Sequence, residues 1–161
     1  MRVYIPLTVP GLTALHATSR IAPAPFAAHA VTPAMRSAVG EADDEELEYS
    51  ALMAAAYDSL VLIAQTGAEA RRVVVAADVD DSDVTVVGGD DVSLVDVAAE
   101  VPLGRCSAVH VDDADADGEV ALAVARLPEA QAGDGHALAA VSLVELELMW
   151  FATQEIPDLL T

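Results

Sequence analysis

The sequence predicts an α/β protein of the α+β type, with an open mixed β-sheet of about five to six strands covered by about three helices. Short β-branched runs such as 73–75 recur between polar turns, which is typical of strands. One long segment, 44–66, repeats apolar residues at helical spacing. The 161 residues suffice for one hydrophobic core, so we expect a single globular domain over residues 1–161.

The first elements alternate between strand and helix. Residues 2–7 combine β-branched and aromatic side chains and are expected to form a strand. Thr8 followed by Pro10 is typical of a helix N-terminus, because threonine caps the helix and proline suits its first turn. Residues 26–31 are expected to form a short strand, and the threonine–proline signal at 32–33 then predicts a second helix.

Segment 44–66 is the clearest predicted helix. Acidic residues crowd its first turns, where they match the positive end of the helix dipole, and Gly67 stands where a glycine typically ends a helix. Its apolar stripe is expected to face the core. The stripe consists of Tyr49, Leu52, Met53, Ala56, Leu60, Ile63 and Ala64.

The second half of the chain is predicted to be rich in strands. Continuous apolar runs are typical of buried strands, and alternating runs of strands with one wet face. Strands are therefore expected at 71–79, 84–87, 92–95, 107–111 and 144–151. Because Leu, Glu and Met favour helix, a helix remains the alternative for the last of these. Trp150 within it is expected to anchor the core.

Two further elements complete the predicted order. A helix is expected from Asp115 to Leu127, ended by Pro128, and residues 131–135 are expected to form a loop. Residues 156–160 are expected to form a closing turn or short helix.

The charge of the chain is strongly one-sided. It has 27 acidic residues against seven arginines and no lysine, for a formal charge of −20. Direct binding to nucleic acid or to an anionic membrane surface is excluded on this ground, because both need clustered cations. A basic protein partner and divalent cations are the natural ligands for such a surface. We also expect added salt to stabilise the fold, because it screens the repulsion between like charges.

The location of the protein is predicted to be cytoplasmic. Cys106 is the single cysteine, which permits no intrachain disulfide and fits a reducing compartment. No uninterrupted apolar run approaches the length of a membrane span, so no membrane association is expected. The sequence leaves the oligomeric state open.

Residues 113–118 (Asp-Ala-Asp-Ala-Asp-Gly) match the first half of a calcium-binding loop. Val124 stands where such a loop needs a bidentate glutamate, so an EF-hand is rejected. A loop in which Asp113, Asp115 and Asp117 hold Ca²⁺ with a ligand from elsewhere would make the protein a calcium-stabilised module. The alternative interpretation is an acidic first turn of the following helix.

A second acidic constellation depends on the topology. Asp78 ends one apolar strand, and Asp112 and Asp113 end another. If the two strands are neighbours and parallel, these carboxylates converge in a crevice at the carboxyl end of the sheet. Such a crevice would suit Mg²⁺ and would favour a Mg²⁺-dependent enzyme acting on a phosphorylated small molecule. If the strands are antiparallel, the cluster does not form.

The remaining reactive side chains favour structural roles. His29 and His110 lie in predicted strands and are expected to be core or hydrogen-bonded histidines, since no zinc-binding spacing is present. Arg105 beside Cys106 would lower the pKa of the thiol, but a lone strand cysteine is usually a small buried hydrophobe. No phosphate-binding loop or hydrolase signature occurs.

Several segments resemble an actinobacterial family of uncharacterised proteins. They are 1–8 (MRVYIPLT), 45–49 (EELEY), 71–78 (RRVVVAAD), 108–113 (AVHVDD) and 150–156 (WFATQEI). The resemblance implies a cytoplasmic protein and implies no activity. We therefore expect a small non-enzymatic interaction or regulatory domain with an acidic surface, with the Mg²⁺-dependent enzyme and the calcium-stabilised module as alternatives.

Overall fold

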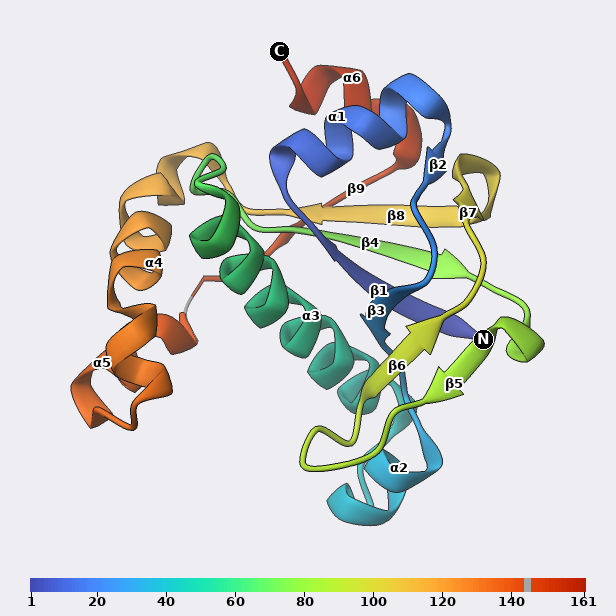
Figure 1. Ribbon diagram of the computed structural model, residues 1–161, viewed down its shortest axis with the longest axis horizontal. Helices are drawn as coiled ribbons and strands as arrows, with labels where there is room; N and C mark the ends of the chain where they lie inside the picture. The colour runs from blue at the N-terminus through green and yellow to red at the C-terminus, as the bar shows by residue number, and fades with distance from the viewer. Residues whose placement is uncertain (144–145) are drawn as a thin grey trace.

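The computed structural model of the protein describes residues 1–143 and 146–161 (Figure 1). Its strands are β1 (Arg2–Leu7), β2 (Arg20–Ile21), β3 (Phe26–His29), β4 (Val73–Asp78), β5 (Val84–Val86), β6 (Leu94–Val97), β7 (Val101–Pro102), β8 (Cys106–Val111) and β9 (Met149–Phe151). Its α-helices are α1 (Val9–Thr18), α2 (Pro33–Val39), α3 (Asp44–Thr66), α4 (Asp117–Gln131), α5 (Gly135–Ser142) and α6 (Ile156–Leu159).

Seven strands form the main sheet in the order β5-β6-β3-β1-β4-β8-β9, and β2 pairs with β7 in a small second sheet. The predicted α+β class is confirmed. Every pairing between the described strands is antiparallel, so the expected mixed sheet is wrong. The reason is that the chain leaves β4 for the far edge of the sheet and returns to β4 as β8 without a helical crossover, which a parallel pair needs.

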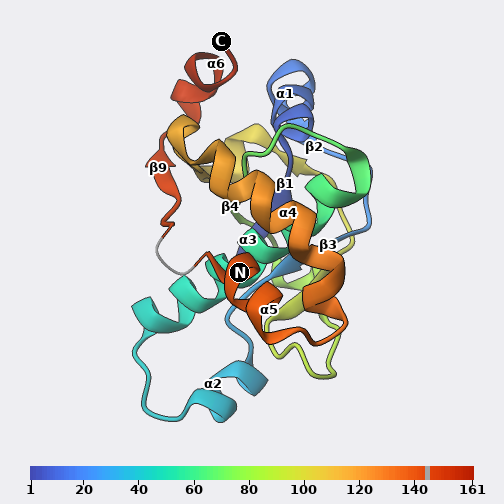
Figure 2. The same ribbon diagram turned by 90° about the vertical axis from the view of Figure 1, so that its left-hand side faces the viewer.

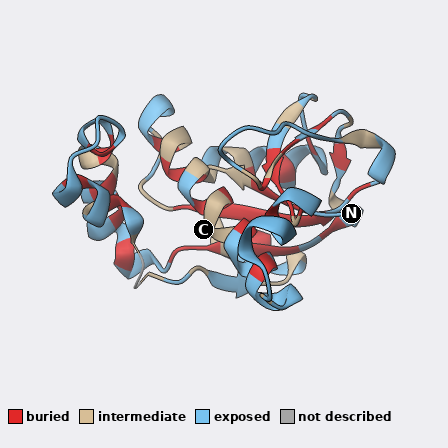
Figure 3. Ribbon diagram, turned by 90° about the horizontal axis from the view of Figure 1, so that it is seen from below, coloured by how far each residue is buried: buried red, intermediate tan, exposed pale blue. Residues whose placement is uncertain are grey.

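The two faces of the main sheet bury different helices. Side chains alternate between the faces of a strand, so Val3 and Ile5 of β1 point to one side and Tyr4 to the other. The first side packs against α1 and α6, which lie together at one end of the molecule (Figures 1 and 2). The second side packs against α3. The strands of the sheet are coloured mostly as buried in Figure 3.

Helix α3 is confirmed over its full predicted range. Asp43 caps it, and Asp43 and Glu46 accept each other's backbone N–H in a capping box. Gly67 ends the helix with a φ of 68°, a left-handed conformation that favours glycine. Its C-terminal half also packs against α4, which in turn contacts α5 (Figure 2).

The buried stripe of α3 is rotated from the predicted one. It consists of Leu47, Ala51, Ala55, Ala56, Ser59, Leu60 and Ile63. Tyr49 and Ala64 were wrongly placed in the core, because small alanines let the helix approach the sheet on a different side. By length and composition α3 would be long and apolar enough to cross a membrane, although no such span was predicted from the sequence. Its packing against the sheet and α4 accounts for the same composition.

Three C-terminal elements differ from the prediction. Helix α4 continues past Pro128 to Gln131, because proline near the end of a helix forfeits a single hydrogen bond and leaves the last turn intact. Helix α5 was not predicted, and only a loop over 131–135 was expected before it, although Asp134 caps the helix by accepting the N–H of Ala137 at 2.9 Å. The strand predicted over 144–151 begins only at Met149, and residues 144–145 lie outside the described residues.

Candidate functional site

The structure places Asp78 and Asp112 at opposite ends of a strand pair. Strands β4 and β8 run antiparallel, with Val73 opposite Val111 and Ala77 opposite Cys106. Asp78 therefore leaves one end of the sheet, whereas Asp112 and Asp113 leave the other, roughly 17–20 Å away by the rise of a strand. The acidic crevice required parallel strands, and these three carboxylates do not converge.

Asp112 is used instead in a buried ion pair with Arg72. The Arg72 Nε donates to Oδ2 at 2.9 Å and Nη2 donates to Oδ1 at 2.7 Å, while the Arg72 backbone N–H also reaches Oδ2 at 2.8 Å. The side chains are 3% and 1% exposed. A carboxylate so fully occupied has no free oxygen to offer a metal ion, and its role is to join β4 to the end of β8.

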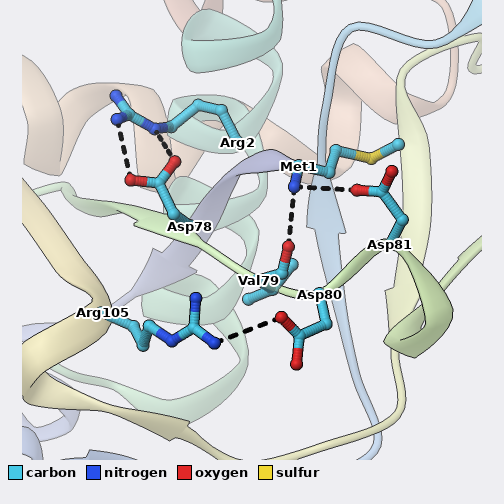
Figure 4. A network of polar contacts seen from close by, with 7 residues as sticks. All are labelled: Met1, Arg2, Asp78, Val79, Asp80, Asp81 and Arg105. Carbon is cyan, nitrogen blue, oxygen red and sulfur yellow. Dashed lines mark hydrogen bonds and ion pairs between the residues drawn. The ribbon is translucent and has the colours of Figure 1, made fainter.

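Asp78 takes part in a network of exposed pairs at the other end of the sheet (Figure 4). The Arg2 guanidinium donates to both of its oxygens, at 2.9 and 3.1 Å. This pairing holds the pKa of the Asp78 carboxyl below its ordinary value. Beside it, Arg105 donates to Asp80 at 3.2 Å.

The pairing of Arg105 with Asp80 overturns one expectation about Cys106. The guanidinium is directed to the carboxylate (Figure 4), and burial raises the pKa of the Cys106 thiol to about 11. The prediction that Arg105 would lower this pKa is therefore wrong. The alternative, a small buried hydrophobe, fits a thiol that is 8% exposed.

Residues 113–117 form the start of α4. Asp113 accepts the backbone N–H of Asp115 at 2.9 Å, and a short 3₁₀ turn over Ala114–Ala116 leads into the helix. Asp115 and Asp117 are exposed. Within 1–143 and 146–161, no group of three or more His, Cys, Asp or Glu side chains is placed to hold a metal ion. The geometry thus favours the helix-start interpretation over the calcium loop.

The sheet is left open where β8 and β9 extend beyond α3, and an open groove of about 430 Å³ lies there. Strands β1, β4 and β8 supply its floor, α3 supplies one wall and β9 the other. The lining residues are Arg2, Tyr4, Glu45, Glu48, Tyr49, Leu52, Ala76, Ser107, Ala108, His110 and Trp150. They include the only tryptophan and two of the three tyrosines of the chain.

Aromatic rings face solvent on both walls of this groove. Trp150, on the edge strand β9, is 62% exposed, and Tyr49, on α3, is 49% exposed. Two large exposed rings over one groove make this surface the candidate binding site. Both residues were wrongly predicted to lie in the core. Met149 and Trp150 are both exposed and only Phe151 is half-buried, because β9 is the edge strand of the sheet, a position that no sequence pattern revealed.

The groove is electrically negative. Glu45 and Glu48 form no ion pair with any described residue, whereas Arg2 is held by Asp78. Burial and the nearby Arg2 lower the pKa of His110, which keeps the imidazole neutral at pH 7. Burial and the Glu48 charge raise the pKa of Tyr4. Two carboxylates without an ion-pair partner, in a groove that also carries exposed aromatic rings, favour a cationic ligand.

His29 has the structural role expected of it. It is fully buried in β3, and its ring nitrogens lie 2.8 Å from Ser93 Oγ and 2.8 Å from Asp58 Oδ2. Strands β1 and β4 separate it from β8, so His29 and His110 do not meet.

Comparison with known families gives one match. A family model described as a family of unknown function (DUF6912) matches residues 1–160. Neither the curated proteins nor the solved structures compared with the chain gave a match.

Proposed function

We propose that this chain, which belongs to the family of unknown function DUF6912, is a non-enzymatic domain of the cytoplasm. Its proposed role is to bind a basic segment of a partner protein. The segment docks in the groove between α3 and β9, and an arginine side chain is its anchor. The single observation that carries this proposal is a groove in which two glutamates, in no ion pair with a described residue, accompany two exposed aromatic rings.

Arginine fits this groove better than lysine does. Its planar guanidinium stacks on the face of an indole ring such as Trp150 and still offers donors to a carboxylate at its edge. Glu45 and Glu48 lie one turn apart on α3, so both carboxylates project from the same wall of the groove. A bidentate arginine–carboxylate pair is the strongest contact available between these groups.

The charge of the whole molecule supports the same partner. A formal charge of −20 attracts a basic segment over several ångströms and raises its association rate, an effect that salt weakens. The same field repels the phosphate backbone of nucleic acids. The Mg²⁺-dependent enzyme gains no support from the geometry, because the carboxylates it requires lie at opposite ends of the sheet.

Trp150 makes the proposal directly measurable. It is the only tryptophan, so its fluorescence should change when an Ala-based peptide carrying two arginines is titrated into the protein at low salt. We expect a lysine-substituted peptide to bind several-fold more weakly and a glutamate-substituted peptide not to bind.

A matched pair of charge variants separates the groove from the general field. E45Q/E48Q should weaken binding of the arginine peptide about tenfold or more, since charge-assisted hydrogen bonds are lost. The control, D115N/E119Q in the 3₁₀ turn before α4 and its first turn, makes the same charge change outside the groove and should weaken binding less than threefold. Equal losses in the two variants, or no fluorescence change at all, would refute the groove as the site.

A further inference from the structure

We propose that a second hollow, between α3 and β3, binds a small apolar ammonium compound through Asp58. The hollow has a volume of about 340 Å³ and is lined by Pro6, Phe26, Ala27, Asp58, Val61 and Leu62. This volume lies in the range of small-molecule sites, and five of its six lining residues are apolar. Among the described residues that line it, Asp58 is the only charged one.

The Asp58 carboxylate is held in place from behind by a buried chain of hydrogen bonds. Its Oδ2 lies 2.8 Å from Nε2 of His29, which is fully buried. Nδ1 of His29 lies 2.8 Å from Ser93 Oγ, and this hydroxyl contacts Asp91 Oδ1 at 2.8 Å. The chain links the loop before β6 to α3 through β3. A carboxylate anchored in this way is oriented before any ligand arrives.

The free side of this carboxylate selects the ligand. No described residue donates a hydrogen bond to Oδ1 of Asp58, so a ligand can supply the donor. A protonated amine does so and adds an ion pair, and its hydrocarbon body covers Phe26, Val61 and Leu62. A carboxylate ligand is repelled by Asp58. A neutral apolar ligand would displace water from the carboxylate without donating a hydrogen bond to replace it.

The size of the hollow limits the ligand to a compact molecule. The site is therefore suited to a primary ammonium group on an aliphatic or aromatic body of drug-fragment size, and is separate from the groove at Trp150. The two sites share no lining residue and use different turns of α3, because Asp58 and Leu62 line one and Glu48 and Leu52 line the other.

Three probes of equal length test the chemistry on the full chain: hexylammonium, hexanol and hexanoate. Amide shifts in ¹H–¹⁵N spectra should move at Phe26, Ala27 and Val61 with hexylammonium at millimolar concentration or below. Hexanol and hexanoate should bind at least tenfold more weakly. If all three bind alike, or if none binds below about 20 mM, the proposal is overturned, because the ion pair with Asp58 should separate them by about tenfold.

Two variants separate ligand binding from a purely structural role of Asp58. D58N should weaken hexylammonium binding at least tenfold, but it also disturbs the contact with His29. A27W fills the hollow from its exposed rim and leaves the Asp58–His29 contact intact, so it should abolish binding without lowering the melting temperature. W150A, in the other groove, should bind hexylammonium as the wild type does. Undiminished binding to A27W would overturn the proposed location.

Discussion

Two arginine–aspartate pairs close the opposite ends of β4, and they differ in burial more than in geometry. At the start of the strand, Arg72 and Asp112 are 3% and 1% exposed. At its end, Arg2 and Asp78 form the same two-pronged contact with side chains 41% and 53% exposed. The contact distances are similar, from 2.7 to 3.1 Å.

The difference shows that hydrogen-bond geometry alone does not set the importance of a pair. Water can replace either partner of the exposed pair when it breaks, so its net worth is small. No water can replace a partner of the buried pair, so either residue left alone would be an uncompensated charge inside the protein. The buried pair is therefore needed to hold the start of β4 against the end of β8. The exposed pair contributes little to the free energy of unfolding.

The largest expected effect is from breaking the buried pair. D112A should lower the free energy of unfolding by about 3–5 kcal/mol, because Arg72 loses its counter-charge without gaining solvent. Chemical denaturation followed by circular dichroism measures this. The double variant R72M/D112L removes both charges and should regain most of the loss. A double variant as unstable as D112A would show that packing, and not the charge, is decisive.

Breaking the exposed pair should have a much smaller effect. D78N should lower the free energy of unfolding by less than about 1 kcal/mol, because solvent screens both groups. The effect should depend on pH. Since Arg2 lowers the folded-state pKa of Asp78, the contribution is present above the unfolded pKa of about 3.9 and is lost as pH falls through the folded value. A D78N deficit that grows as the solution is acidified below pH 4 would contradict this.

Salt should separate the two pairs further. Molar NaCl should abolish the D78N deficit and leave the D112A deficit nearly unchanged, because salt screens exposed charges and hardly reaches buried ones. The wild-type melting temperature should itself rise with salt as the repulsion within a chain of charge −20 is screened. A wild-type melting temperature that is the same at low and molar salt would show that repulsion between the acidic residues does not limit stability.

The last expectation concerns the thiol near the exposed pair and leaves the stability of the fold unchanged. Cys106 lies opposite Ala77, next to Asp78, yet it is buried and its pKa is raised to about 11. Its alkylation by iodoacetamide at pH 8 should be at least about 100-fold slower than that of a free cysteine, because little thiolate is present. A rate like that of a free thiol would show that this end of β4 opens readily to solvent.

Elements built from local signals could be predicted from the sequence. The range of α3 followed from its acidic start and Gly67, and β1 and β4 from their β-branched runs. The direction of β8 relative to β4 could not be predicted, because it depends on the route of the chain through β5, β6 and β7. That route places Asp78 and Asp112 at opposite ends of the strand pair, so they do not form a common site.

The groove escaped prediction for a related reason. Tyr49 and Trp150 are apolar enough for a core, and sequence patterns assign such residues to the interior. Whether a core position is covered depends on how far α3 reaches across the sheet, which is a tertiary property. Helix α5 was missed because glycines at 133 and 135 flank its capping residue and are typical of a loop.

The central place of β1 in the sheet has a consequence for synthesis of the protein. This strand is made first, but its longest pairing, six residues with β4, involves residues up to Asp78. At a translation rate of about 5–20 residues per second, β1 waits roughly 4–14 s for β4 to be made. During that interval Val3 and Ile5 lack the β4 side of their pairing, so their apolar side chains can contact other molecules near the ribosome.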